Sequence, residues 1–261
     1  MAVERQSIGQ FDVNIWSEGT GEPLLFLHGY ERHPGSAGFL TRLAQKYRVI
    51  APEQPGYGSS TGFEQIRDMT DLVLFYRSLI GSWGVSQIDV VGHSTGGMLA
   101  AELAALAPQV VRRLVLVDSF GLWLDDLPAP DPFGSPRRVL AAKWHDPESR
   151  PDPEPTIFVP DPDDPDAGAL FEAQNRATAT KFMWPIAERG LRRRLKYVTA
   201  PTLVVHGASD GLLPLPYAEE MVSLISDARL HVIEGAGHYP MIEQEDAFVA
   251  AVEGFLTGGD S

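Results

Sequence analysis

The chain has 261 residues, of which 44% are hydrophobic, and a formal net charge of −14. This length and apolar content fit one large folded domain, and the acidic excess disfavours nucleic acid or an anionic membrane as partner. The absence of cysteine excludes a disulfide framework, a thiolate nucleophile and a cysteine-ligated metal centre. We expect a cytoplasmic protein without signal peptide or membrane span, because no apolar run is long enough for either.

Strand-like and helix-like patterns alternate along the first 120 residues. Runs of β-branched and apolar residues predict strands, whereas apolar residues three and four positions apart predict helices. The predicted strands are 13–16, 24–27, 48–51, 88–91 and 110–117, and the predicted helices are 39–46, 68–83 and 98–107. Near-continuous apolar strands separated by helices indicate an α/β fold with a doubly wound, mostly parallel sheet.

The composition changes after residue 120. Residues 121–170 hold 11 of the 21 prolines, and proline cannot donate to a sheet, so this stretch lies outside the sheet core. A helical pattern broken at Pro185 follows. The alternation then resumes with two predicted strands and two predicted helices: strands 202–205 and 229–233, helices 217–225 and 245–256.

We therefore predict one core domain, formed by residues 1–120 and 197–261 and interrupted by an insert at 121–196. Two independent domains joined by a linker are the alternative. The C-terminal part has only two predicted strands, however, which is too few to close a core of its own.

The strongest motif is Gly92-His93-Ser94-Thr95-Gly96, between a predicted strand and a predicted helix. A serine on such a turn has a strained backbone, and the flanking glycines let strand and helix approach closely. The turn exposes the serine hydroxyl at a helix N-terminus, where backbone N–H groups favour a developing oxyanion. We predict that Ser94 is a nucleophile; a buried serine in a tight turn is the alternative.

A serine hydroxyl needs a base to take its proton. His238 lies in a glycine-rich loop before the last predicted helix, which suits a residue that reaches another strand end. Asp210 and Asp118 each follow a predicted strand, where parallel sheets place their sites. We favour Asp210 as the partner of His238, because the chain order is then Ser, Asp, His. Asp118 is the other candidate carboxylate.

The segment His28-Gly29-Tyr30 directly follows another predicted strand. Enzymes with a nucleophile of this type take a second oxyanion donor from this loop. We assign the two backbone N–H donors to Thr95 and Tyr30. His28 is interpreted as a structural, hydrogen-bonding histidine rather than a second base.

These segments together resemble the motif series of the α/β-hydrolase superfamily, in its capped serine esterase and haloperoxidase-like branch. The segments that carry the resemblance are 27–29, 53–60, 92–97, 201–207 with Asp210, and 235–238. The resemblance implies an eight-stranded, mostly parallel sheet with a helical cap insert over the site. Glu53 departs from it, because members commonly carry aspartate there.

The insert is rich in aromatic residues, and some of them are expected to line an apolar pocket above Ser94. The tentative pocket residues are Trp123, Trp144, Phe182 and Trp184. Packing of the insert against the sheet is the alternative role for these side chains. The acidic run 161–166 lacks the glycine and the distal glutamate of a calcium loop, so we expect a solvated loop and no metal.

We predict a serine hydrolase that cleaves a carboxylic ester of a small to medium, mostly apolar substrate through an acyl-enzyme. The same triad could instead cleave a carbon–carbon bond, open a lactone or carry out perhydrolysis. A ligand-binding receptor with a slow triad is an alternative of another class. We expect no cofactor and a small-molecule substrate as partner; a homo-oligomer is neither indicated nor excluded.

Overall fold

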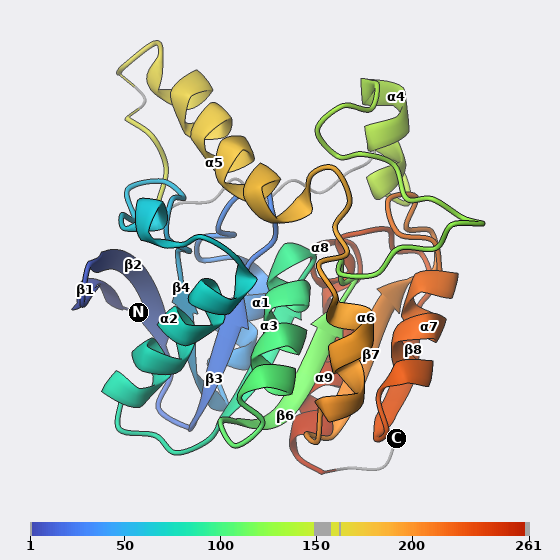
Figure 1. The fold of residues 1–261 in the computed structure, drawn as a ribbon, viewed down its shortest axis with the longest axis horizontal. Helices are drawn as coiled ribbons and strands as arrows, with labels where there is room; N and C mark the ends of the chain where they lie inside the picture. Colours follow the sequence, from blue (N-terminus) through green and yellow to red (C-terminus); the bar gives the residue numbers. More distant parts are fainter. Residues whose placement is uncertain (1, 149–157, 162, 259–261) are drawn as a thin grey trace.

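The computed structural model describes residues 2–148, 158–161 and 163–258, and its centre is one eight-stranded sheet (Figure 1). The strands are β1 (Ala2–Ile8), β2 (Phe11–Glu18), β3 (Glu22–Leu27), β4 (Tyr47–Pro52), β5 (Ile88–His93), β6 (Val111–Val117), β7 (Thr202–Gly207) and β8 (Ala228–Ile233). Their order in the sheet is β1-β2-β4-β3-β5-β6-β7-β8. The pairs β1–β2 and β2–β4 are antiparallel, and the other five pairs are parallel. This confirms the predicted α/β fold.

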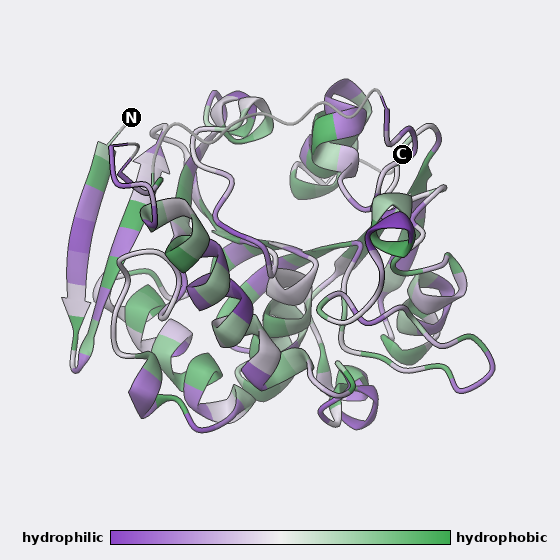
Figure 2. Cartoon of the chain, turned by 90° about the horizontal axis from the view of Figure 1, so that it is seen from above, coloured by the Kyte–Doolittle hydropathy of each residue, from purple (hydrophilic) through white to green (hydrophobic). Residues whose placement is uncertain are grey.

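The first strand, β1, was not predicted from the sequence. Polar and charged residues occupy most of Ala2–Ile8, and the strand lies at the edge of the sheet, where most of its side chains are exposed. In Figure 2 this strand, which begins near the N label, carries both hydrophilic and hydrophobic residues. An edge strand that buries little surface has no clear alternation of apolar residues.

Helices cover both faces of the sheet. They are α1 (Gly38–Leu43), α2 (Met69–Ser82), α3 (Thr95–Leu106), α4 (Arg137–Leu140), α5 (Ala167–Met183), α6 (Leu191–Arg194), α7 (Pro216–Leu224), α8 (Pro240–Glu243) and α9 (Glu245–Leu256), with short 3₁₀ turns η1 (Phe63–Gln65), η2 (Ala141–Lys143) and η3 (Leu195–Tyr197). Figure 1 shows α2, α3, α6 and α7 in front of the sheet and α1 and α9 behind it. Each face buries its own hydrophobic cluster, as a two-sided parallel sheet requires.

The central helix is α3, which follows β5. Every residue from Thr95 to Ala105 is buried, which explains its alanine- and leucine-rich composition: a helix surrounded on all sides by protein has no polar face. The helix starts three residues before the predicted 98–107, directly after Ser94. The nucleophile candidate therefore lies at the N-terminus of the most buried helix of the fold.

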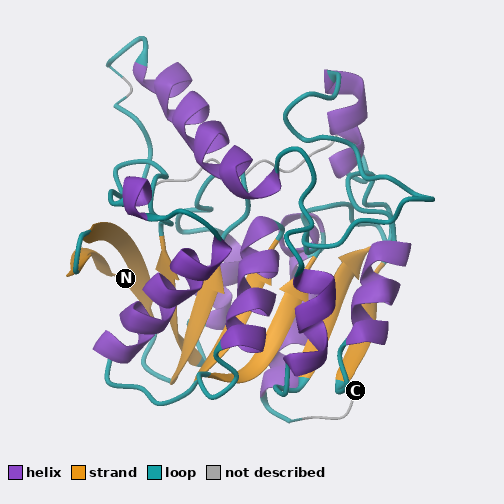
Figure 3. Ribbon diagram, in the orientation of Figure 1, coloured by secondary structure: helices purple, strands orange, loops and turns teal. Residues whose placement is uncertain are grey.

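The segment 121–196, called the cap segment below, contains α4, η2, α5 and α6. In Figure 3 its loops and the helices α4 and α5 lie beyond the carboxyl ends of the strands, whereas α6 packs beside α3. One end of α5 is anchored to the core, because Thr178 Oγ1 donates to Gly56 O at 2.8 Å and Asn175 Oδ1 accepts from Gly58 N at 3.1 Å. The division into core and cap stays a prediction. Part of the acidic stretch 146–166 lies outside the described residues.

Candidate active site

Ser94 lies on a sharp turn between β5 and α3. Its φ of 58° is in the left-handed region, which non-glycine residues rarely adopt and which is strained. The turn is held because Ser94 N donates to Val117 O at 2.9 Å and Phe120 N donates to Ser94 O at 3.1 Å. A Cβ at Gly96 would lie 2.1 Å from Leu27 O, so this position must be glycine for α3 to pack against β3.

The structure brings the three predicted triad residues together. Ser94 Oγ–H donates to His238 Nε2 at 2.9 Å, and His238 Nδ1–H donates to Asp210 Oδ2 at 2.7 Å. Ser94, His238 and Asp210 follow β5, β8 and β7 respectively, so they meet at the carboxyl edge of the sheet. A nucleophile, a base and an orienting carboxylate in one hydrogen-bonded chain can transfer a proton away from the serine hydroxyl.

Asp210 is the carboxylate that the protein keeps ionised. Its Oδ1 accepts the N–H groups of Leu212 and Leu213 at 2.8 and 3.1 Å. Burial alone would raise the pKa of Asp210, but His238 and the backbone donor Leu213 N hold it below its ordinary value. A buried negative charge beside His238 stabilises the imidazolium that forms when the serine loses its proton.

His93 supports His238, a contact that the sequence did not reveal. Its Nε2–H donates to the backbone oxygen of His238 at 2.7 Å, and the two rings lie 5.0 Å apart. Burial lowers the pKa of His93 to about 3, so the ring is neutral. The only signal in the sequence was its place beside Ser94, because a bond to a backbone atom 145 positions away has no motif.

The cap segment is tied directly to the loops that carry the acid and the base. Gly211 N donates to Ala142 O at 2.9 Å, and His238 N donates to Lys143 O at 2.6 Å. A Cβ at Gly211 would lie 2.5 Å from Ala142 Cβ, so glycine is needed for this close approach. Residues 141–145 therefore pack against both loops.

The loop after β3 passes beside the nucleophile. A Cβ at Gly29 would lie 3.1 Å from Ser94 Cβ, and both Tyr30 and Thr95 are buried. This places the loop where an oxyanion donor is needed, and the donor roles of the two residues stay a prediction. His28 uses both ring nitrogens for structure, with Nδ1–H donating to Gly29 O at 2.8 Å and Nε2 accepting from Gln54 N at 3.0 Å.

Ser94 and His238 expose none of their surface. A cleft of about 470 Å³ lies between the cap segment and the loop after β3, and Tyr30 and Lys143 line it. Its apolar wall includes Tyr30, Phe133 and Phe171. Its charged side chains are three cations and two carboxylates: Arg32, Lys143, Arg176, Glu31 and Glu172. The cleft is thus locally positive in a chain whose net charge is −14.

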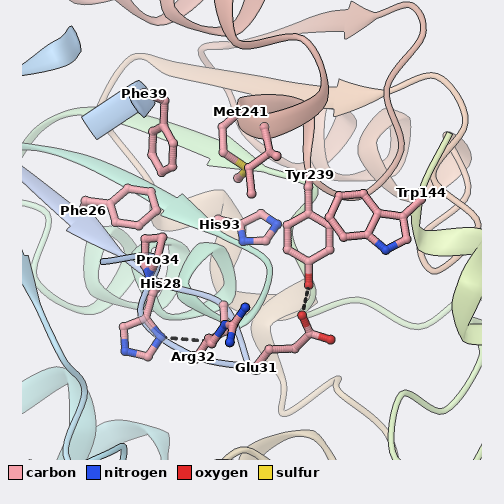
Figure 4. A pocket seen from close by; sticks show the side chains of 12 residues that line it. Phe26, His28, Glu31, Arg32, Pro34, Phe39, His93, Trp144, Tyr239 and Met241 are labelled. Atoms are coloured by element: carbon pink, nitrogen blue, oxygen red, sulfur yellow. Dashed lines mark hydrogen bonds between the residues drawn. The ribbon is translucent and has the colours of Figure 1, made fainter. Parts of the chain in front are cut away.

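A second cavity, of about 70 Å³, lies beside His93 (Figure 4). Phe26, Phe39 and Met241 form its apolar side. On the other side the Tyr239 hydroxyl donates to Glu31, and the Tyr239 ring stacks on Trp144 with centroids 4.7 Å apart. Glu31 and Trp144 also line the larger cleft, so these side chains form the wall between the two spaces.

The predicted pocket aromatics divide into two groups. Trp144 lines both spaces described above, and Phe182 lines a small cavity with Thr95. Trp123 and Trp184 line none of the cavities described above, and a pocket role for them stays a prediction. Trp184 is 56% exposed just after the end of α5. Trp123 is partly buried, and its Nε1–H donates to Asp125 at 3.1 Å.

One group among the described residues has the spacing of a metal site. Ligand atoms of Asp118, His206 and Asp210 lie within 4.8 Å of one another. Two members of this group already take part in hydrogen bonds within the protein. Asp210 accepts the bonds described above, and His206 Nε2–H donates to Leu213 O at 2.8 Å. No described helix is both long and apolar enough to cross a bilayer.

The sheet, the strained serine turn and the Ser–His–Asp geometry define the α/β-hydrolase class of fold. The chain belongs to the family described as alpha/beta hydrolases, whose model matches residues 24–251. It is therefore a hydrolase. This confirms the resemblance inferred from the motifs.

Among characterised relatives, the chain is similar to 2-hydroxymuconate semialdehyde hydrolase of Pseudomonas putida, with 29% identity over 96% of this chain and 92% of the relative. It is also 26% identical to 2-hydroxy-6-oxo-2,4-heptadienoate hydrolase of Pseudomonas putida strain F1, over 97% of this chain and 95% of the relative.

Among solved structures, 2-hydroxy-6-oxo-6-phenylhexa-2,4-dienoate hydrolase from Rhodococcus sp. strain RHA1 matches with a TM-score of 0.76 and 19% identity, over 98% of both chains. A bacterial membrane phospholipase A matches with a TM-score of 0.78 and 20% identity, over 98% of this chain and 86% of the other. At these identities the structural matches show the fold alone.

Proposed function

We propose that this chain is a serine hydrolase that cleaves a carbon–carbon bond beside a carbonyl group in a substrate that carries a carboxylate. The observation that carries this proposal is the locally positive cleft lined by Tyr30 and by Lys143, whose backbone oxygen accepts from His238 N. The names of the two Pseudomonas relatives support it, because muconate semialdehydes and oxo-heptadienoates are acids without an ester bond. Hydrolysis of such molecules must break a carbon–carbon bond.

Arg176 is the side chain of the cleft best suited to bind the carboxylate. It lies on α5, lines the cleft and has no ion pair with any residue that the structure describes. Lys143 is already paired with Glu31. Burial raises the pKa of Tyr30 and the charge of Arg176 opposes this rise, which places the guanidinium near the proposed oxyanion donor. Guanidinium groups bind carboxylates in a fork-like geometry.

The chemistry follows from the triad. Ser94 Oγ bonds to the carbonyl carbon while its proton moves to His238 Nε2, and Asp210 stabilises the imidazolium. The oxyanion receives hydrogen bonds from the N–H groups of Tyr30 and Thr95. The carbon–carbon bond then breaks, its electron pair leaves with the departing carbon, and His238 returns the proton there. Water, deprotonated by the same histidine, finally hydrolyses the acyl group from Ser94.

Hydrolysis of a carboxylic ester is the second candidate, and the apolar cleft wall of Tyr30, Phe133 and Phe171 favours it. The same steps apply, with an alkoxide instead of a carbanion as the leaving group. An ester is the easier substrate, since an alkoxide needs less stabilisation than a carbanion. A C–C hydrolase is therefore expected to retain some activity on activated esters.

Steady-state kinetics on a 2-hydroxy-6-oxo-dienoate and on neutral p-nitrophenyl butyrate would test the proposal. We expect the acid to have the higher kcat/KM in the wild type. Arg176→Gln should lower kcat/KM for the acid about 100-fold, as expected for a lost charged hydrogen bond, and leave the neutral ester within about threefold. Arg193→Gln, an exposed arginine on α6, is the matched control.

A wild type that hydrolyses the ester and not the acid would overturn carbon–carbon cleavage in favour of ester hydrolysis. Equal losses on both substrates in Arg176→Gln would argue that this arginine supports the fold of the cap segment instead of binding the carboxylate.

A further inference from the structure

A second carboxyl group lies beside the triad and has no part in the reaction described above. Asp118 follows β6, between the strands that carry Ser94 and Asp210. It is fully buried and has a φ of 40°, an unfavourable conformation that a buried non-glycine residue retains only where its surroundings impose it. An oxygen of Asp118 lies within 4.8 Å of the ligand atoms of His206 and Asp210.

The hydrogen-bond donors around the two carboxyls are unequal. Asp210 accepts from Leu212 N, Leu213 N and His238 Nδ1. Asp118 Oδ1 accepts only from Gly207 N at 3.0 Å, and Asp118 Oδ2 has no donor within the described residues. A buried carboxylate needs several donors or a cation, so the single negative charge of this pair belongs on Asp210.

His206 does not supply the missing donor. Its Nδ1 lies 3.3 Å from Asp118 Oδ1, but its Nε2–H is given to Leu213 O. Burial lowers the pKa of His206, and a neutral ring protonated on Nε2 has only a lone pair on Nδ1. The proton that satisfies this cluster must therefore be carried by Asp118 itself.

We propose that Asp118 is a neutral carboxylic acid that donates its proton in a hydrogen bond to Asp210, and so acts as a positioning residue for the triad. Burial and the neighbouring charges of Asp210 and Glu243 all raise the pKa of Asp118, which agrees with the donor count. The bond between the two side chains holds the Asp210 carboxylate in place and adds no second negative charge next to the imidazolium.

The test compares Asp118→Asn with Asp118→Ala in pH profiles of kcat/KM, on the substrate that the wild type hydrolyses best. The Asn amide can donate like a neutral acid, so kcat/KM should stay within about threefold and the acidic limb should not move. Asp118→Ala removes a donor to a charged group, and about a tenfold loss is expected. Recovery by Asn and not by Ala identifies the donor role.

The competing state, an ionised Asp118 beside an imidazolium His206, gives the opposite result. Asp118→Asn would then remove a negative charge near His238, and the acidic limb would move to lower pH by half a unit or more. Such a shift, or a loss in Asn as large as that in Ala, would overturn the proposal.

Spectroscopy of the otherwise intact protein covers the case in which the Asp118 variants do not fold. Burial also raises the pKa of Glu53, so the experiment uses Glu53→Gln to remove that second candidate. Infrared spectra at pH 7 should still contain the C=O stretch of a protonated carboxyl group. Absence of this band would overturn the proposal that Asp118 is neutral. It would leave the proposed carbon–carbon cleavage untouched, because the infrared measurement does not depend on activity.

Discussion

The loops at the strand ends and the cap segment meet at His238, where Lys143 O accepts from His238 N, but the protein holds them differently. The triad residues are wholly buried and fixed by hydrogen bonds from neighbouring strand ends. The outer part of the cap segment is held to the site loops at residues 141–145 and to the core at one end of α5, and a cleft of about 470 Å³ lies between it and the loop after β3.

From this difference we infer that the sheet edge carries out the chemical steps and that the cap segment selects the substrate. The sheet edge supplies a nucleophile, a base and a carboxylate that suit any acyl substrate, whereas the cap segment supplies Phe133, Phe171 and Arg176 to the cleft. Substitutions in the first region should affect all substrates alike, and substitutions in the second should affect substrates unequally.

The largest effect is expected from the nucleophile. Ser94→Ala should reduce kcat by about 10⁴-fold or more on acid and ester alike, because it removes the hydroxyl that is hydrogen-bonded to His238 Nε2. Assays with the two substrates and a thermal melt check this, with Ser119→Ala as a buried control. If Ser94→Ala kept activity on only one of the two substrates, the triad would not act equally on both substrate classes, and the prediction would be wrong.

A pH effect is expected in the sheet region. Burial lowers the pKa of His28 to about 4, below the value of about 6.5 in an unfolded chain, so the unfolded state binds the proton first as the pH falls. The contribution of His28 to the free energy of unfolding is therefore fully present above pH 6.5 and is lost as the pH falls toward 4. Between pH 7.5 and pH 5 this contribution decreases by about 2 kcal/mol.

Urea unfolding of the wild type and of His28→Gln at both pH values measures this. The glutamine amide offers a donor and an acceptor but does not titrate, so the variant should lose about 2 kcal/mol less than the wild type on acidification. Parallel losses in the two proteins would show that His28 is protonated without unfolding.

The junction between the regions should respond next. Gly211→Ala places a methyl group 2.5 Å from Ala142 Cβ, and such overpacking should lower the free energy of unfolding by about 1.5 kcal/mol. Because Lys143 O also binds His238 N, kcat should fall for both substrates. A Cβ at Gly211 would also lie 2.6 Å from Ala142 O, so Ala142→Gly in the same chain should restore only part of the loss. A double variant as stable as the wild type would show that the Ala142 side chain alone causes the overpacking.

The smallest effect is expected where α5 is anchored. Thr178→Val keeps the shape and removes the donor to Gly56 O, which should cost about 1 kcal/mol of stability. KM should change more than kcat, since the anchor positions the cleft and not the triad. Thr180→Val, whose hydroxyl bonds within its own helix, is the control. A change in kcat alone would contradict the separation of the two regions.

The sequence predicted the sheet region well because its signals are local. Near-continuous apolar strands and the Gly92–Gly96 spacing each have one physical explanation, and the structure confirms the fold and places Ser94, His238 and Asp210 in one hydrogen-bonded chain. The edge strand β1 was missed because it buries too little surface to show a pattern. The contact of His93 with His238 was missed because a backbone acceptor has no sequence signature.

The cap segment was less predictable, because aromatic content says nothing about direction. Trp144 and Trp184 have the same side chain, yet one stacks on Tyr239 and the other is 56% exposed. Their positions depend on loop paths that proline-rich sequence does not encode in a periodic form.

The complete burial of Ser94 has a consequence for labelling experiments. A fluorophosphonate probe can reach the hydroxyl only after the protein opens, so its reaction requires opening followed by chemical capture. At high probe concentration the rate of labelling then becomes independent of concentration and equals the frequency of opening. The rate of labelling thereby measures how often the protein exposes its nucleophile.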